Sequence, residues 1–410
     1  MLKKIHIDQL RKGMYIQELC GSWMEHPFWR SSFLLTEKKD FQKILDSSIT
    51  ELWIDTAKGA DVQAGEQAIS EEQAQAEVNK KIQQLADTSH NKTIQPVAID
   101  EELNRAAKIC TRSKEAVVSM FQEARLGNAI DAHNAQALVE EIYESVNRHS
   151  AALLSLARLK TADDYTYMHS VAVCALMIAL ARQLNLSEHE VHQAGMAGLL
   201  HDLGKAFTPN EVLNKPGKLT DEEFAIMKSH PSKGYHILKE TPSIDDVALD
   251  VCLHHHEKIN GSGYPEGLSG EMISQFAKMG AVCDVYDAIT SNRPYKSGWD
   301  PAESIRKMAE WTEGHFDPQI FQHFVKSIGI YPTGSLVRLD SEKLGVVIEQ
   351  TQHSLLTPKV KVFYSIKSGT RIAPKVLDLS SDQCSDKIRG RENPADWDFP
   401  DLIELWSAGL

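Results

Sequence analysis

The chain has 410 residues, of which 42% are hydrophobic and 25% charged, and its formal net charge is -13. This length accommodates two or three domains, and the acidic charge argues against general binding of nucleic-acid polymers, which favours a basic surface. The longest apolar run, Val171 to Ala181, is far shorter than the roughly 20 residues of a membrane span. The first residues lack the apolar core of a signal peptide, and the six cysteines show no C-x-x-C pairing. We therefore expect a cytoplasmic protein with reduced thiols and no membrane anchor.

Three segments precede the central region. Residues 1–62 contain short apolar runs separated by turn residues, which predicts a small β-rich N-terminal domain. Residues 63–98 are rich in Ala, Gln, Glu and Asp, the composition of an acidic linker. Residues 99–154 place apolar side chains at helical spacing, which predicts connecting helices. These helices would relay a signal, pair with a second copy of the chain or a signalling protein, or only pack; the sequence leaves this choice open.

The rest of the chain is predicted to be helical and then to return to strands. Residues 155–332 form successive helical patterns with short connections, which indicates an all-helical bundle with varied crossing angles. Residues 333–410 contain strand-like runs, and Asp340 to Lys343 has the composition of a hairpin turn. The predicted fold class is therefore mainly α, with a β-rich domain before the bundle and a small antiparallel β accessory unit after it.

The stretch His201-Asp202-Leu203-Gly204-Lys205 concentrates polar groups at the end of an apolar run. We expect it to continue a buried helix, on which His201 and Lys205 share a face and Asp202 lies beside them. A buried carboxylate needs a partner, because burying it unpaired is costly. That partner is either Lys205 or a metal ion, and these five residues alone do not decide between them.

Histidines and acids recur through the helical region at intervals of about 25 to 32 residues, close to one helix and its return connection. One such residue alone would more often be a satisfied core histidine or part of an ordinary ion pair. At matched spacing the set instead predicts ligands that meet at one metal site. The groups are His169, His201-Asp202, His230, His254 to Glu257, and Asp284.

The kinds of ligand narrow the choice of metal. The set contains no thiolate, which disfavours a structural zinc site of the cysteine type. Imidazoles with carboxylates suit iron or manganese, and also cobalt, nickel or zinc. Seven ligands are too many for one small cation, whereas two ions that share Asp202 would use them. A metal pair about 3.5 to 4 Å apart suits phosphoryl transfer.

A second cluster favours phosphate chemistry. The glycine-rich loop Asn260-Gly261-Ser262-Gly263-Tyr264-Pro265 follows the histidine run, and Arg293 and Lys296 flank a proline beyond Asp284. Two cations near a metal centre suit a phosphodiester in an acidic protein. Each feature alone also has an ordinary explanation, a surface salt bridge or a tight turn.

Together these motifs resemble the HD-GYP domain, a branch of the HD metal-dependent phosphohydrolases. The resemblance covers about residues 155 to 332, and residues 1–62 resemble a small domain of unknown function often placed before HD-GYP domains. It implies hydrolysis of the bacterial second messenger cyclic di-GMP to linear pGpG, and in many members onward to GMP. The motifs are His201-Asp202 with Lys205, His255-His256-Glu257, Gly263-Tyr264-Pro265, and Asp284 with Arg293-Pro294-Tyr295-Lys296.

The resemblance also implies residue roles, with two divalent metal ions activating water and no covalent nucleophile. Lys205 would contact the scissile phosphate and stabilise its charge, and the loop of Gly263, Tyr264 and Pro265 would shape the substrate pocket. Arg293 and Lys296 would hold substrate phosphates. The implied metal ligands are His169, His201, Asp202 as the bridge, His230, His255, His256 and Asp284, with His254 as the alternative if the register slips by one.

Two departures and two alternatives accompany this resemblance. Asn260 stands where the family usually has an aspartate. Tyr165 stands where some members carry a glutamate for a third metal; a neutral phenol is a poor substitute, so we expect two ions.

One alternative function is a module that binds a cyclic dinucleotide without turnover, which the complete ligand set and Lys205 argue against. The other is a phosphodiesterase for mixed cyclic GMP-AMP, which the sequence does not exclude.

Overall fold

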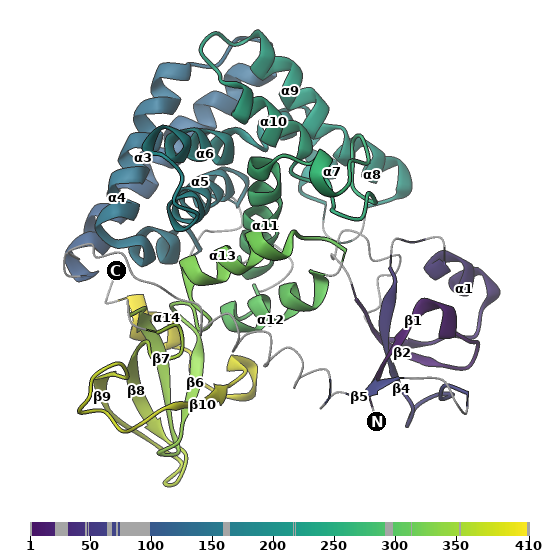
Figure 1. The fold of residues 1–410 in the computed structure, drawn as a ribbon, viewed down its shortest axis with the longest axis vertical. Coiled ribbons are helices and arrows are strands. Elements are labelled where there is room, and N and C mark those ends of the chain that lie inside the picture. The colour runs from purple at the N-terminus through teal and green to yellow at the C-terminus, as the bar shows by residue number, and fades with distance from the viewer. Residues whose placement is uncertain are drawn as a thin grey trace. The chain divides into compact units, whose positions relative to one another are not determined.

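A computed structural model describes most of the chain: residues 2–20, 32–45, 47, 49–63, 68–70, 73, 99–158, 165–215, 217, 219–291, 298–312, 314–351 and 354–407. The chain divides into two compact units, Met1–Gln84 and Leu85–Leu410 (Figure 1). Most of the predicted linker, 63–98, lies outside the described residues, and the finer domain boundaries stay predictions.

The first unit is built around a five-stranded antiparallel sheet in the order β3-β2-β4-β1-β5. Strand β4 pairs with β1 from Asp55 opposite Leu2 to Glu51 opposite His6. The predicted β-rich N-terminal domain is confirmed, although β1 and β5 were not expected. The elements are β1 (Leu2–His6), the 3-10 turn η1 (Ile7–Gln9), β2 (Tyr15–Leu19), β3 (Phe33–Leu34), helix α1 (Lys38–Leu45), β4 (Glu51–Asp55) and β5 (Ile69–Ser70).

Helices make up the first part of the second unit. Every residue from Met168 to Ala181 is buried, so the longest apolar run is the centre of a helical core, where a helix is apolar on all sides. Among the described helices, none combines the length and the apolar character required to cross a bilayer. The elements are α3 (Ile99–Arg125), α4 (Ala132–Arg158), α5 (Tyr165–Gln183), α6 (Glu188–Leu200), the 3-10 turn η3 (Leu203–Phe207), α7 (Asn210–Leu213), α8 (Asp221–Lys228), α9 (His230–Glu240), α10 (Asp246–His254), the 3-10 turn η4 (Gly270–Met272), α11 (Gln275–Thr290), α12 (Pro301–Trp311) and α13 (Pro318–Ile328).

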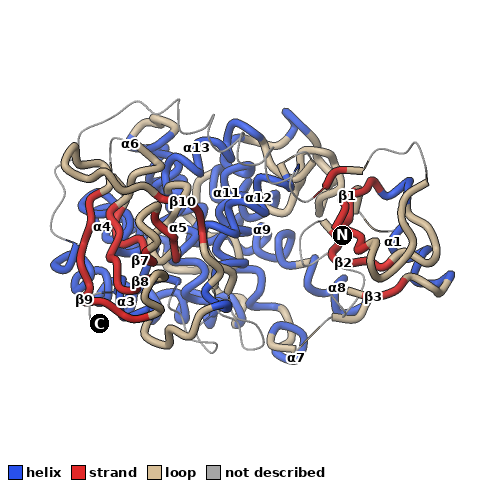
Figure 2. Tube along the Cα trace, turned by 90° about the horizontal axis from the view of Figure 1, so that it is seen from below, coloured by secondary structure: helices blue, strands red, loops and turns tan. Residues whose placement is uncertain are grey.

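A second antiparallel sheet, in the order β10-β6-β7-β8-β9, follows the helices. The expected hairpin is present, with Leu336 of β6 opposite Val346 of β7. Side chains pack on both faces of this sheet, and Trp406 of α14 belongs to the core on one of them. Figure 2 shows these strands as a group of their own. The elements are β6 (Leu336–Leu339), β7 (Lys343–Glu349), β8 (Lys359–Ser365), β9 (Thr370–Asp378), β10 (Ile388–Arg391), the 3-10 turn η5 (Pro394–Asp396) and α14 (Leu402–Ser407).

Candidate metal centre

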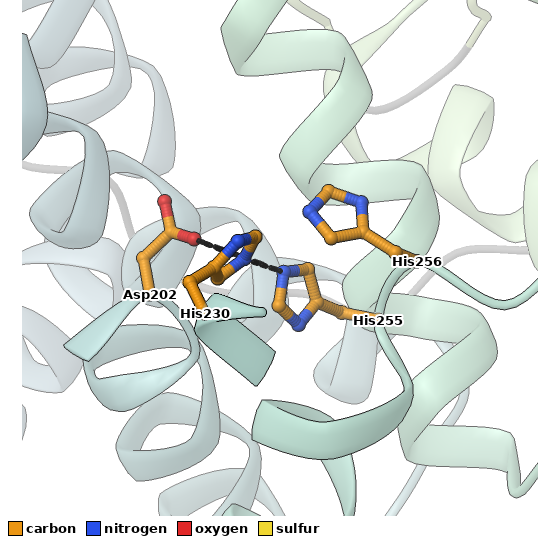
Figure 3. Close-up of side chains that lie close together, drawn as sticks. All are labelled: Asp202, His230, His255 and His256. Atoms are coloured by element: carbon orange, nitrogen blue, oxygen red, sulfur yellow. Dashed lines mark hydrogen bonds and ion pairs between the residues drawn. The ribbon is translucent and has the colours of Figure 1, made fainter. Parts of the chain in front are cut away.

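Several elements of the helical region bring the seven predicted ligands together. All seven are buried, and the largest exposed fraction, 9%, belongs to His256. Figure 3 shows four of them converging, with close contacts from Asp202 to His230 and from His230 to His255. The positions are His169 in α5, His201 at the end of α6, Asp202 before η3, His230 at the start of α9, His255 and His256 after α10, and Asp284 in α11.

The donor atoms form two overlapping groups. In one group, donor atoms of Asp202, His230, His255 and His256 all lie within 4.8 Å of one another. In the other, donor atoms of His169, His201 and Asp202 do so. Asp202 belongs to both groups, which is the arrangement that a carboxylate shared by two ions requires.

Asp284 lies beside both groups. Its Oδ1 is 2.9 Å from Nε2 of His169, and its Oδ2 is 3.8 Å from Nδ1 of His256. The structure therefore brings all seven predicted ligands into one cluster.

The expected continuous helix through residues 201–205 is wrong. Helix α6 ends at Leu200, and Asp202 has φ -102° and ψ 7°, outside the helical region. Lys205 therefore lies on the following 3-10 turn, where its ammonium contacts Oδ2 of Asp202. The geometry is compatible with both predicted partners of the Asp202 carboxylate, Lys205 and a metal ion. Lys205 pairs with one oxygen, while the other, Oδ1, lies 3.2 Å from Nε2 of His230.

Glycines bring η3 and α9 into contact at this point. A Cβ on Gly204 would lie 1.9 Å from the carbonyl oxygen of His230 and 2.6 Å from the backbone nitrogen of Gly234. A side chain at position 204 would therefore push apart the elements that carry Asp202 and His230. The chain bends at Asp202 to make this backbone contact.

Hydrogen bonds determine which nitrogen three of the histidines turn toward the cluster. In His201, His230 and His255, Nδ1 lies 2.8 to 3.0 Å from a backbone carbonyl oxygen. A carbonyl only accepts, so Nδ1 carries the proton and donates it, and Nε2 is the nitrogen turned toward the cluster, where a neutral ring would present a lone pair. The Nε2 atoms of His230 and His255 face each other at 3.3 Å. Two lone pairs at that distance repel, and a cation bound by both removes the repulsion.

The charge states also fit a divalent cation. Burial lowers the pKa of His201, lowers the pKa of His255 to about 3, and holds the pKa of His256 well below its usual value. Burial alone would raise the pKa of Asp202, but Lys205 and the nearby histidines outweigh it and hold that pKa well below the ordinary range. The cluster thus combines neutral imidazoles with ionised carboxylates, a donor set for divalent metal ions. In addition, the buried Nε2 of His201 has no hydrogen-bond partner in the part of the chain that the structure describes.

His169 differs from the other histidines because both its nitrogens meet carboxylates. Nδ1 lies 2.6 Å from Oδ2 of Asp287, and Nε2 lies 2.9 Å from Oδ1 of Asp284. Burial alone would lower the pKa of His169, but the two carboxylates outweigh it and raise the pKa. Asp287 is suited to orient His169 through Nδ1, as carboxylates behind metal-binding histidines do. Asp287 was not among the predicted site residues, although its spacing of three from Asp284 puts both on one helix face.

The glycine-rich loop is held beside the cluster by its own hydrogen bonds. Glu257, which is 2% exposed, accepts hydrogen bonds from three backbone N–H groups of residues 266–268. Tyr264 stacks on His256 with ring centroids 4.7 Å apart. A Cβ on Gly263 would lie 2.5 Å from Cα of Glu257, so only glycine permits this close return of the chain.

The side-chain oxygen of Asn260 accepts two hydrogen bonds within the loop. Its Oδ1 accepts from the backbone N–H of Ser262 at 3.0 Å and from the hydroxyl of Ser262 at 2.7 Å. An aspartate would offer the same acceptor, so this departure from the family pattern preserves the turn.

His254 and the cysteines lie outside the donor groups. Nδ1 of His254 lies 2.7 Å from Asp250 and its Nε2 lies 3.4 Å from Glu266, so the alternative register is not the one adopted.

No cysteine sulfur joins either donor group within the described part of the chain. Burial raises the pKa of Cys174, Cys252 and Cys283, which keeps them as thiols.

Some predicted site residues have no described side chain. Arg293 and Lys296 lie outside the described residues. Helix α5 begins at Tyr165, but the description does not extend to that side chain. Their roles, and the expectation of two ions instead of three, stay predictions.

Comparisons with known proteins match nearly the whole chain. A domain of unknown function (DUF3391) matches residues 2–135, and the HD domain matches residues 138–320. The protein named cyclic di-GMP phosphodiesterase PA4108, from Pseudomonas aeruginosa, is 55% identical over 408 residues, which are 99% of this chain and 96% of that protein. The cyclic di-GMP phosphodiesterase response regulator RpfG, from Xanthomonas campestris, is 39% identical over 45% of this chain and 49% of its own. The 3'3'-cGAMP-specific phosphodiesterase 1 of Vibrio cholerae is 32% identical over 47% of this chain and 45% of its own.

Proposed function

The chain belongs to the HD-GYP family of HD-domain phosphohydrolases, and from this membership we propose that it is a metal-dependent phosphodiesterase that hydrolyses cyclic di-GMP. The observation that carries the proposal is the pair of donor groups sharing Asp202, because two adjacent divalent ions suit cleavage of a phosphodiester. The proposed product is linear pGpG, with GMP after a second cleavage. Because the substrate is a bacterial second messenger, we propose a cytoplasmic location.

We assign two divalent ions to the cluster, with Asp202 between them. His230, His255 and His256 would hold one ion, and His169 and His201 the other. Asp284, which lies beside both groups, completes the set. Imidazole and carboxylate donors make iron or manganese our first choice, with nickel, cobalt and zinc as alternatives.

Bound divalent ions supply an activated water and neutralise charge on the phosphate. The residues of the chain bind and orient the substrate. The side chain of Lys205 is 18% exposed and its ammonium contacts Asp202, so it lies at the accessible edge of the cluster and is placed to donate to non-bridging phosphate oxygens. The hydroxyl of Tyr264 is buried and has no hydrogen-bond partner among the described residues, and burial raises its pKa well above the usual value. Tyr264 therefore keeps its proton as a donor for substrate, and we assign Arg293 and Lys296 to substrate phosphates.

Relatives named as 3'3'-cGAMP-specific phosphodiesterases favour a second candidate substrate, mixed cyclic GMP-AMP. Three such proteins from Vibrio cholerae are 32% to 35% identical to the matched part of this chain. The two substrates differ in one base and share both phosphates, so the same cluster serves either. Direct competition between them decides which is preferred.

The connecting helices give the catalytic region, proposed as residues 155–332, a contact for regulation. Nε of Arg125 in α3 donates to the carbonyl oxygen of Ala206 at 3.0 Å. Ala206 follows Lys205 in η3, so a partner or second copy that moves α3 would act on the turn that carries Lys205. We propose the N-terminal region as the place where such a partner binds.

The test is reconstitution of metal-free protein with Fe(II) or Mn(II), followed by chromatography of products from cyclic di-GMP and from cyclic GMP-AMP. We expect turnover only after metal addition and none in Asp202→Ala. His192→Ala is the matched control, because His192 pairs with Glu140 at a partly exposed position outside the cluster. Full activity in protein shown to be metal-free would refute the proposal. Binding of the dinucleotide by loaded protein without any product would instead favour a binding module.

A further inference from the structure

Lys228, the last residue of α8, is an exposed cation beside the metal centre. The proposed mechanism gives this lysine no role. Its Nζ lies 5.3 Å from the ring centroid of Tyr264 and 4.7 Å from that of Phe224. Tyr264 itself stacks on His256. Lys228 therefore lies next to the aromatic ring that stacks on a proposed metal ligand.

Within the described part of the chain, no acid forms an ion pair with Lys228. Among the described residues, no carboxylate lies within 4.0 Å of its Nζ, whereas Lys205 pairs with Asp202 and Lys215 pairs with Glu223. A cation–π contact at an exposed position is a weak attraction. In a chain with a net charge of -13, an ammonium held at this position without an acid remains available to an anion.

The backbone keeps Lys228 close to the site. Only Ser229 separates it from the proposed ligand His230, so the end of α8 is tied to the metal centre. Phe224 lies one turn earlier on the same face of α8. No residue of α8 is buried, so this helix contributes to the rim of the site and not to the core.

We propose that Lys228 binds the second phosphate of the substrate, the one that is not at the metal centre. This inference rests on the proposed function. A cyclic dinucleotide carries two phosphates on opposite sides of one macrocycle, so when one is at the metals the other lies several ångströms away. Lys205 is placed for the first phosphate, and Lys228, beside the Tyr264 ring, is placed for the second. An ammonium is a common ligand for such an anion.

The test compares Lys228→Gln with a lysine in a similar contact elsewhere. Nζ of Lys239 lies 5.4 Å from the ring centroid of Tyr235, and Lys239 is also exposed. It lies nine residues after His230 on α9, about 13 Å along the helix axis. Calorimetric titration of metal-free protein with cyclic di-GMP measures binding without turnover. We expect about tenfold weaker binding for Lys228→Gln, and affinities close to wild type for Lys228→Arg and Lys239→Gln.

Steady-state kinetics of the loaded enzyme separate substrate binding from a purely structural role. Loss of the second-phosphate contact raises KM for cyclic di-GMP about tenfold with little change in kcat. It leaves cleavage of bis(4-nitrophenyl) phosphate, which has one phosphate, unchanged. An equal loss on both substrates would show that Lys228 only supports the loop, and wild-type binding by Lys228→Gln would also overturn the inference.

The proposed function and the inference fail separately. If loaded wild-type protein turned over no cyclic dinucleotide, the proposed function would fail, while the titrations of metal-free protein would still test Lys228. If wild-type protein bound no cyclic di-GMP in either form, both would be overturned.

Discussion

Replacing Gly204 with alanine is expected to separate the two halves of the metal centre. Gly204 lies two residues after Asp202 in η3, and Gly234 lies one turn after His230 in α9. The added Cβ would come 1.9 Å from the carbonyl oxygen of His230 and 2.6 Å from the nitrogen of Gly234. Both are backbone atoms, so no side-chain rotation relieves the clash, and η3 and α9 must move apart.

The magnitude follows from the nature of this clash. Overpacking typically costs 1–3 kcal/mol, and a collision between backbones belongs at the upper end, about 3 kcal/mol. With an unfolding entropy of about 2.1 cal/mol/K per residue over residues 85–410, this cost lowers the melting temperature by roughly 4 °C. Metal binding is expected to weaken as well, because Asp202 Oδ1 and His230 Nε2, which lie 3.2 Å apart, belong to the elements that separate. We expect metal affinity to fall by about 100-fold.

Metal content after dialysis against a chelator-buffered metal solution, together with differential scanning fluorimetry, measures both effects. Gly390→Ala is the control, because a Cβ at that position in β10 meets nothing within 4 Å. It should keep the wild-type metal content and melting temperature. If Gly204→Ala also kept both, the close contact between η3 and α9 would not be what positions the ligands.

Three further predictions concern single residues of the site. Asp202→Ala should lose bound metal and turnover together, whereas Arg293→Ala should keep its metal and raise KM; equal metal loss in both variants would refute this division of roles. Asp287→Asn should weaken metal binding by about 10- to 100-fold, because it removes the carboxylate that holds Nδ1 of His169; unchanged affinity in a metal titration would exclude that role. Because the pKa of His169 is raised, metal must displace a proton from it below that pKa, so loading there should release a proton and affinity should fall as pH falls through that pKa. Calorimetry in buffers of different ionisation enthalpy measures the release, which should be lost in His169→Asn.

The sequence predicted the ligand cluster because its members have no common explanation other than a shared site. His169 precedes an apolar run, His201 and Asp284 follow such runs, and the intervals match one helix and its return. The mainly α class and the two flanking β regions followed from periodicity. Strands β1, β5 and β10 were not predicted. Strands β5 and β10 have only two and four residues, and alternation over so few positions is no signal.

Other features depend on contacts between distant residues. The apolar run through Leu203 predicts a continuous helix, but the backbone contact of Gly204 with His230, 26 positions away, requires a bend that no local window contains. The register of His254 and His255 was likewise open, because consecutive histidines differ only in the direction that the end of α10 gives them. Asp287 was missed because a second carboxylate after Asp284 is also ordinary in an exposed helix.

His201, His230 and His255, in which Nδ1 carries the proton, share one feature that links the fold to the site. Each Nδ1–H donates to a carbonyl in the last turn of a helix: Gly198 in α6, Met227 in α8, and Val251 in α10. Carbonyls in a last turn lack some of the backbone partners that interior carbonyls have, so they can accept an imidazole N–H. Those of Met227 and Val251 also accept a backbone N–H from the residue that caps the helix. Helix C-termini also carry partial negative charge, and three of them meet at this cluster. The same helix ends therefore orient the imidazoles and favour cations, which accounts for the buried cluster forming where the helices stop.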